Sequence, residues 1–378
     1  MYRILTNKSI SDGEVLQGES YLIDGSTIID RGEGLQGGEV IDLRGLIVMP
    51  GFIDMHTHGI MGNDVMDCTY ESLNDISLHK LKEGCTSFCP TTVTAPWDKT
   101  LLAVKNVSSA MEKGVQGAKI IGSFLEGLYI NPKNKGAHPE DCIRPINLDE
   151  IKELISAGGV ASIIIAPELP GAIPAITELV KMGVQVRLGH TNATIEEAEA
   201  GIAAGATSAV HMFNAMSPLH HREPGMVGCV LTNAAICGEL ICDMVHVHER
   251  VCQILAQAKG AEGCVLVTDC MAAGGLPDGE YKLGELAVKV KDGISRLPDG
   301  TIAGSTTTMI ECVKNMHQRV GTPLEQAVQM ATATPAKILA RFNEIGSLDM
   351  GKTADIIGVD GEFKVRFVMT DGIVKESA

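Results

Sequence analysis

Between residues 50 and 270, short apolar runs alternate with segments that carry helix signals. One such signal is the capping box Thr194–Glu197, which precedes an alanine-rich stretch that stops at Gly205. Runs that are almost continuously apolar are typical of parallel strands covered by helices on both faces. The eight expected strands are Phe52–His58, Thr86–Pro90, Lys119–Glu126, Val160–Pro167, Val184–His190, Ser208–Phe213, Leu240–His246 and Val265–Asp269.

Eight strands separated by helices predict an α/β fold, a (β/α)₈ TIM barrel, which we assign to residues 50–340. A doubly wound open sheet is the alternative, but no GxGxxG motif follows the first strand. Residues 281–304 interrupt the alternation and read as short strands joined by turns at Asp292-Gly293 and Asp299-Gly300.

The two ends of the chain carry a different pattern, one of short strands and tight turns. Near the N-terminus, Tyr21–Ile23 and Thr27–Ile29 flank an Asp-Gly turn, and near the C-terminus Asp371-Gly372 turns a last hairpin. Each segment is too small to bury a core alone. We therefore predict that residues 1–49 and 341–378 combine into one small β-sandwich domain beside the barrel.

Composition excludes several classes of partner. The net charge of −16 disfavours nucleic acid, whose phosphates need a basic face. No apolar run approaches the roughly 20 residues of a membrane span, and the N-terminus lacks the regions of a signal peptide. The eleven cysteines form no CxxC pair and are expected to be reduced. We expect a cytoplasmic protein with neither a nucleic-acid nor a membrane partner.

Polar residues stand out where the expected strands end. In a strand, side chains two residues apart share a face, so the two histidines of PGFIDMHTHG point the same way. A lone histidine is more often a satisfied core residue, but strand ends meet at one rim of a barrel, where active sites lie. The metal-competent residues at these ends are His56, His58, Glu126, His190, His211 and Asp269.

This set predicts a metal-dependent hydrolase. Glu126, His190 and His211 supply the three protein ligands of a catalytic metal site, and His56 with His58 provide for a second metal that Glu126 can bridge. Zinc is the expected metal, although iron, manganese or cobalt suits the same ligands. A metal-bound water has a pKa near ~7, and Asp269 can take its proton and pass it to a leaving group. The expected reaction is hydrolysis of a carbonyl-type bond.

A family resemblance makes this expectation specific. The segments PGFIDMHTHG, FLEGLYINPKNKGAHP, LGHTNA, HMFNAM, REPG, LVTDCMAA and IAGSTTTM occur in this order. They resemble the N-acetylglucosamine-6-phosphate deacetylases of the amidohydrolase superfamily, nearly end to end of the barrel. The resemblance implies cleavage of N-acetyl-D-glucosamine 6-phosphate to D-glucosamine 6-phosphate and acetate. It also matches Glu126, His190 and His211 to the metal ligands and Asp269 to the catalytic acid/base.

The resemblance further implies a set of substrate contacts and a homodimer. In the family, the arginine that matches Arg222 reaches across a dimer interface to the neighbour's phosphate, and His246 holds the sugar and polarises the amide carbonyl. Leu128-Tyr129 stand where Pro-Phe is expected, a departure that we expect to adjust the pocket. The implied substrate-binding residues are Ala137, His138, Asn214, Ala215, Arg222, Asp243, His246, Ile302, Ala303 and Gly304.

Three alternatives remain open. A deacetylase for the galactosamine or mannosamine isomer differs by one inverted hydroxyl group. A cyclic-amide hydrolase shares the fold, but such enzymes bridge two metals with a lysine near the end of the fourth strand, where this chain has Ile165–Glu168. A catalytically silent scaffold is expected to have lost ligands, and none of the six positions is lost.

Overall fold

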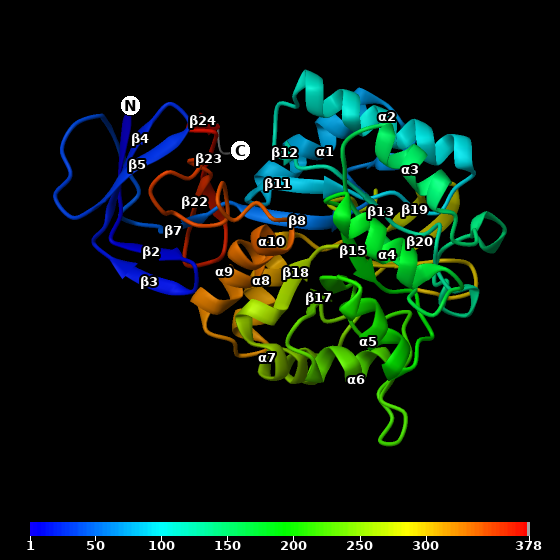
Figure 1. Cartoon of the computed structure of the whole chain (residues 1–378). Coiled ribbons are helices and arrows are strands. Elements are labelled where there is room, and N and C mark those ends of the chain that lie inside the picture. Colours follow the sequence, from blue (N-terminus) through cyan, green and yellow to red (C-terminus); the bar gives the residue numbers. More distant parts are fainter. Residues whose placement is uncertain (376–378) are drawn as a thin grey trace.

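Strands from the two ends of the chain pair with each other in the computed structural model, which describes residues 1–375. A six-stranded sheet has the order β24-β23-β22-β7-β2-β3, and a four-stranded sheet has the order β5-β4-β1-β6. Figure 1 shows these blue and red strands side by side at one end of the molecule. Their bounds are β1 Tyr2–Leu5, β2 Lys8–Ser11, β3 Glu14–Gln17, β4 Ser20–Asp24, β5 Thr27–Gly32, β6 Glu39–Asp42, β7 Ile47–Pro50, β22 Ile356–Val359, β23 Val365–Thr370 and β24 Ile373–Lys375.

One apolar core lies between the two sheets, as in a β-sandwich. Ile4 and Tyr21 from the four-stranded sheet pack with Val48, Ile356 and Met369 from the six-stranded sheet. The last hairpin turns at Asp371-Gly372, both with left-handed φ (51° and 70°), as a two-residue turn requires. The predicted domain boundaries at residues 49/50 and 340/341 stay a prediction.

Eight parallel strand positions form the barrel beside this sandwich. A parallel bridge between Thr57 and Cys270 closes the ring between its first and last strands, and a bridge between Thr91 and Phe124 joins its second and third. The predicted fold class, a TIM barrel with a small β domain, is confirmed. The barrel strands are β8 Phe52–Thr57, β11 Cys85–Pro90, β12 Lys119–Ile120 with β13 Ser123–Leu125, β14 Val160–Ile165, β15 Gln185–Leu188, β16 Ser208–Ala209, β17 Cys237–Ile241 and β18 Cys264–Val267.

Three predicted strands differ from the observed ones by a break or by more than two residues at an end, each for a local reason. The third splits at Gly122, whose φ of 152° suits only glycine and where a Cβ would lie 2.8 Å from that of Ala161. The sixth stops at Ala209, since His211 and Phe213 have left-handed φ. The prediction of strand over Leu240–His246 is wrong beyond Ile241, because the Asp243 carboxylate accepts two backbone N–H groups and turns the chain.

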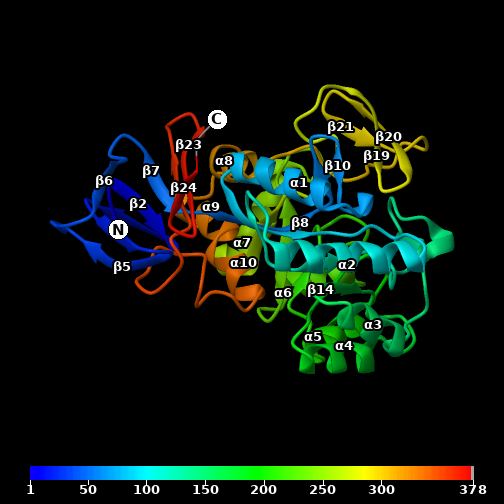
Figure 2. The same cartoon turned by 90° about the horizontal axis from the view of Figure 1, so that it is seen from above.

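Helices cover the outside of the barrel, and the Thr194–Glu197 capping box begins α5 as predicted. The interruption after β18 is an antiparallel sheet of β19 Gly279–Leu283, β20 Leu286–Lys291 and β21 Ile294–Arg296, far from the sandwich (Figure 2). Among residues 1–375 no helix has the length and apolar character needed to cross a membrane. The helices are α1 Tyr70–Lys82, α2 Trp97–Lys113, α3 Leu148–Ser156, α4 Ala172–Lys181, α5 Ile195–Ala203, α6 Gly225–Thr232, α7 Glu249–Gly263, α8 Met309–Gln318, α9 Leu324–Ala331 and α10 Ala333–Ile338. The short elements are β9 Gly59–Ile60, β10 Asn63–Asp64, and the 3₁₀ turns Val65–Asp67, Pro132–Asn134 and Glu140–Cys142.

Candidate active site

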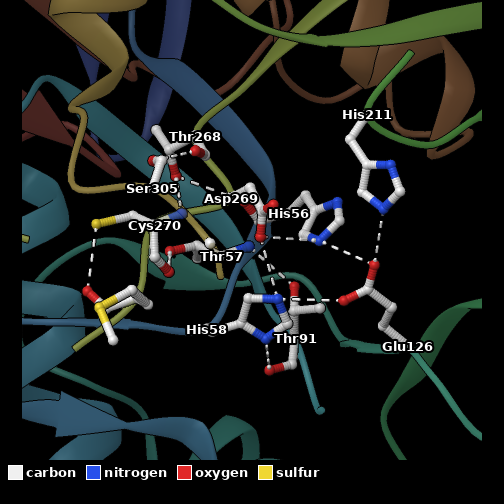
Figure 3. A network of polar contacts seen from close by, with 12 residues as sticks. His56, Thr57, His58, Thr91, Glu126, His211, Thr268, Asp269, Cys270 and Ser305 are labelled. Atoms are coloured by element: carbon white, nitrogen blue, oxygen red, sulfur yellow. Dashed lines mark hydrogen bonds and ion pairs between the residues drawn. The ribbon is translucent and has the colours of Figure 1, made fainter. Parts of the chain in front are cut away.

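The six metal-competent residues predicted at strand ends converge at one rim of the barrel. Figure 3 shows five of them, from four separate barrel strand ends, pointing toward one another. All six are buried, and the Glu126 carboxylate lies at the centre of the group. Its oxygens lie 3.2–3.5 Å from a ring nitrogen of each of the histidines His56, His58, His190 and His211.

Three of these residues have a backbone conformation that is unusual for their type. The φ angles are 46° at His190, 29° at His211 and 49° at Asp269, all in the left-handed region. Each residue follows the last residue of a barrel strand by two positions. Left-handed backbone costs energy in a residue with a Cβ and persists only where its surroundings hold it, typically at functional sites.

Hydrogen bonds to backbone carbonyls determine the tautomers of two histidines. The Nδ1 of His190 lies 2.8 Å from the carbonyl oxygen of Asn134, and the Nδ1 of His211 lies 3.2 Å from that of Asn214. A carbonyl only accepts, so each Nδ1 carries a hydrogen, which leaves Nε2 as the nitrogen whose lone pair can point inward to a metal. The two Nε2 atoms are 3.0 Å apart, and Glu126 Oε1 lies 3.5 and 3.3 Å from them.

This triangle fits a divalent cation. Lone pairs that face each other at such distances repel unless a positive charge lies between them. Ligands at about 2.0–2.1 Å from a tetrahedral zinc ion are separated by about 3.3 Å, which is close to the three separations here. Such cations also prefer this set of ligands, which is two imidazoles and a carboxylate.

A second cluster shares the same glutamate. The Nδ1 of His58 lies 3.2 Å from the carbonyl oxygen of Thr91, so its Nε2 faces Glu126 Oε2 at 3.2 Å and Asp269 Oδ1 at 3.1 Å. The Nε2 of His56 is 3.5 Å from Glu126 Oε1 and 3.4 Å from Asp269 Oδ1. His56, His58 and Glu126 thus form a second candidate cation site, with Glu126 between the two.

The electrostatics of the cluster are those of a cation site. Burial opposes ionisation of the rings, but the carboxylates of Glu126 and Asp269 raise the pKa of His58 to about 9 and that of His56 well above its usual range. In turn, despite burial, the rings lower the pKa of Asp269 to about 2 and that of Glu126 well below its usual range. Protons on the rings supply the positive charge that the two carboxylates demand, and a bound cation supplies it equally well.

His138 lies in the same cluster but has the opposite tautomer. It groups geometrically with Glu126 and His190, yet the backbone N–H of Thr94 donates to its Nδ1 at 3.2 Å. Burial and the nearby His190 lower the pKa of His138 to about 3, so the ring is neutral. Its Nε2 therefore carries the hydrogen, which suits a hydrogen-bond donor to a ligand and not a metal ligand.

A cavity of about 410 Å³ opens onto the cluster. Asp243 lies behind one of its walls, where its Oδ2 accepts from the Nδ1 of His246 at 2.7 Å, and Ala303 is buried. Arg222 lies outside the cavity, on an exposed loop before α6. Leu128 and Tyr129 are buried and do not line it, and their expected effect on the pocket stays a prediction. The predicted substrate-binding residues that line the cavity are Ala137, His138, Asn214, Ala215, His246, Ile302 and Gly304.

Sequence reasoning missed a buried charged network behind the histidine strand. Lys80 of α1 is fully buried, and its Nζ lies 2.9 Å from Asp54 Oδ2, 3.2 Å from Glu83 Oε2 and 3.3 Å from Thr268 Oγ1. Asp54 also accepts from Thr268 Oγ1 at 2.6 Å, which ties β8 to the strand that leads to Asp269. The available signal was Asp54 itself, an acid inside an otherwise apolar run.

Comparison with known proteins identifies the family. The model of the amidohydrolase family matches residues 47–375. The chain belongs to the amidohydrolase family. Among relatives of this amidohydrolase, N-acetylglucosamine-6-phosphate deacetylase of Vibrio furnissii is 39% identical over 369 residues, covering 95% of this chain and 92% of the relative. N-acetylgalactosamine-6-phosphate deacetylase of Escherichia coli O157:H7 is 39% identical over 328 residues, covering 86% and 87%.

Two solved structures superpose on nearly the whole chain of this amidohydrolase. An aspartate-to-alanine variant of N-acetyl-D-glucosamine-6-phosphate deacetylase from Mycobacterium smegmatis, in complex with N-acetyl-D-glucosamine 6-phosphate, superposes with a TM-score of 0.93. It is 32% identical and covers 99% of this chain and 98% of its own. The deacetylase from Pasteurella multocida has a TM-score of 0.94 at 31% identity, with 99% of each chain covered.

Proposed function

We propose that this amidohydrolase removes the acetyl group from N-acetyl-D-glucosamine 6-phosphate, releasing D-glucosamine 6-phosphate and acetate. The observation that carries the proposal is the convergence of Glu126, His190 and His211 at the rim of the barrel, with their lone pairs directed at one point. The deacetylases among its relatives supply the substrate class, amino-sugar phosphates.

The metal ligands of the proposed enzyme are Glu126, His190 and His211 at one site and His56 and His58 at the other, with Glu126 shared. A bound divalent cation lowers the pKa of a water molecule to near ~7 and polarises a carbonyl oxygen. Zinc is our first choice of metal because it prefers imidazole and carboxylate ligands in tetrahedral geometry. One or two cations per subunit are consistent with this ligand set.

Asp269 is the proposed general base and then general acid. Its carboxylate lies at the cavity, and its lowered pKa of about 2 keeps it ionised and able to accept a proton. It takes a proton from the water molecule that attacks the amide carbonyl carbon. It then gives that proton to the sugar nitrogen as the C–N bond breaks, so that the leaving group departs as a neutral amine.

Two histidines at the cavity orient the substrate. His138 directs its Nε2–H inward. Asp243 accepts from His246 Nδ1, and despite burial its charge raises the pKa of His246. The protonated ring that this favours can also donate from Nε2 to the amide carbonyl or a sugar hydroxyl. We propose that Arg222, outside its own cavity, serves the phosphate group in the partner of a homodimer, where a guanidinium can bind phosphate bidentately.

The galactosamine isomer is the second candidate substrate, because the E. coli relative named for it has the same 39% identity as the V. furnissii glucosamine relative, over 328 residues against 369. A cyclic-amide substrate is disfavoured, since Glu168 at the fourth strand end accepts from Asn131 and Thr191 and faces no metal cluster. We also propose a cytoplasmic location, which the eleven free cysteines support.

The deciding experiment is acetate release from the 6-phosphates of N-acetylglucosamine, N-acetylgalactosamine and N-acetylmannosamine, with metal content measured on the same sample. We expect Asp269→Asn to lower kcat by about 10²–10⁴-fold while the fold and the metal content are kept. Faster acetate release from the galactosamine or mannosamine compound would identify that isomer as the substrate and keep the rest of the proposal. Full activity of Asp269→Asn, or no activity in a metal-loaded sample on any of the three sugars, would refute the proposal.

A further inference from the structure

Beneath the metal cluster, the interior of the barrel holds an ion pair that the proposed reaction does not use. Arg187 of β15 and Glu239 of β17 have no exposed surface, and each is flanked in its strand by small or apolar residues. Removing two charges from water costs several kcal/mol per ion, which their attraction offsets only when every polar atom is paired. A charged pair in the centre of a barrel is therefore a poor device for stability alone.

This pair is only partly satisfied. Glu239 Oε1 accepts from Ser208 Oγ at 2.6 Å and lies 3.5 Å from Arg187 Nη1, which donates to the carbonyl oxygen of Met55 at 2.9 Å. Within residues 1–375, Arg187 Nε and Nη2 and Glu239 Oε2 have no hydrogen-bond partner. Buried polar atoms without a partner call for an explanation.

The free oxygen of Glu239 faces a histidine of the metal cluster. Glu239 Oε2 lies 3.6 Å from the Nδ1 of His56, whose ring has no exposed surface. Phe124 links the two sides of this arrangement, because the Arg187 guanidinium lies 4.1 Å from its ring centroid and the His56 ring packs edge-on at 4.9 Å. The His56 ring thus lies between two groups of side chains. Glu239 and Phe124, both in contact with Arg187, lie on one side, and Glu126 and Asp269 face Nε2 on the other.

At His56, Glu239 takes the place that a backbone carbonyl has at the other three histidines of the metal cluster. The Nδ1 atoms of His58, His190 and His211 each face a backbone carbonyl oxygen, which turns Nε2 toward Glu126. Among the described residues no backbone carbonyl hydrogen-bonds the Nδ1 of His56, and the Glu239 carboxylate lies near this atom instead, at 3.6 Å. A carboxylate paired with the second nitrogen of a metal-bound histidine sets its tautomer and orientation.

We propose that Glu239 is a positioning residue for His56. Its carboxylate, held by Arg187 and Ser208, keeps the hydrogen on Nδ1 and presents Nε2 to the cation site formed by His56, His58 and Glu126. The arrangement then governs occupancy of that second site and leaves the site of His190 and His211 unaffected. This inference rests on the metal-dependent function proposed above.

The test is a zinc titration of metal-free protein in competition with a chromophoric chelator. We expect Glu239→Gln to weaken one of two equivalents by about 10–100-fold and to leave the other unchanged. Ser208→Ala, which keeps both charges and removes only the 2.6 Å hydrogen bond, should weaken the same equivalent by less. The matched control is Asp355→Asn, since Asp355 is a buried carboxylate paired with Lys119 at 2.9 Å and does not line the cavity.

The control separates positioning from stability. Glu239→Gln and Asp355→Asn are both expected to lower the melting temperature of metal-free protein, but only Glu239→Gln should change zinc affinity. Unchanged affinity of both equivalents in Glu239→Gln and Ser208→Ala would overturn the inference and leave the proposed function standing. A wild type that binds a single equivalent would also overturn the inference alone. A wild type that binds no zinc or other divalent metal would overturn both.

Discussion

Replacing Lys80 with methionine tests how strongly the barrel depends on its buried charges. The Lys80 ammonium has no exposed surface and is surrounded by Asp54, Glu83 and Thr268 within 3.3 Å. Methionine keeps the length and apolar stem of the side chain but leaves two buried carboxylates facing each other. Breaking a buried pair from one side costs about 3–5 kcal/mol.

That loss of free energy corresponds to a measurable decrease in melting temperature. Unfolding entropy is about 2.1 cal/mol/K per residue, so the 378 residues give about 0.8 kcal/mol/K and an expected loss of about 4–6 °C. Lys82→Met is the matched control, because Lys82 lies on the same helix and is exposed. Differential scanning calorimetry at pH 8 on both variants makes the comparison.

The pH dependence of the deficit identifies its cause. Burial raises the pKa of Glu83 to about 7, and Lys80 partly opposes this shift. A folded pKa above the unfolded value of the carboxyl means that its contribution is present at acid pH and is lost as pH rises through about 7. Without Lys80 the pKa rises further, so the deficit should shrink at pH 5, where Glu83 takes up a proton. Equal melting temperatures for Lys80→Met and Lys82→Met at pH 8 would refute the reasoning.

Two further predictions concern the cluster and the phosphate. Because the metal-free cluster raises the pKa of His58 from 6.5 to about 9, metal-free protein should lose about 3 kcal/mol of stability as pH rises across that interval. Metal-loaded protein should not show this loss. The free energy of unfolding of each form is measured by urea denaturation at several pH values, and the same pH dependence in both forms would contradict the prediction. Arg222→Met should raise KM for the 6-phosphate about 10–100-fold and leave unphosphorylated N-acetylglucosamine unaffected. Arg250→Met, at another exposed arginine, should change the KM of neither the 6-phosphate nor the unphosphorylated sugar. If Arg222→Met and Arg250→Met changed the KM for the 6-phosphate equally, a phosphate contact of Arg222 would be excluded.

The fold was predictable because its signals are local. Most barrel strands are short, mainly apolar runs that are largely buried, so they read as strands without knowledge of their partners. The residues that follow these runs, such as His190 and Asp269, stand at strand ends for the same reason. Boundaries were less predictable, because the split at Gly122 depends on close contact with Ala161 of the next strand.

The parts that escaped prediction depend on contacts between residues far apart in sequence. Lys80 carries no sign of burial in its amphipathic helix, and its partner Thr268 is 188 residues away. The tautomer of His58 depends on the carbonyl of Thr91, and that of His138 on the N–H of Thr94. No spacing rule within one sequence encodes which carbonyl will face a given ring, so composition and motifs could assign these histidines to a site but not divide them into ligands and donors.

Backbone hydrogen bonds explain how the barrel holds its strained strand ends. A left-handed residue with a Cβ costs on the order of 1–3 kcal/mol, and three such residues meet at this site. The carbonyl of His190 accepts from Asn131 N at 2.9 Å, while Asp269 donates its N–H to His56 O at 2.9 Å and accepts from Ser305 N at 2.7 Å. The bonds around Asp269 join the last barrel strand to the first, and Asp54 reinforces the same junction from below through Thr268. At Asp269 the strain is therefore offset by contacts that close the barrel.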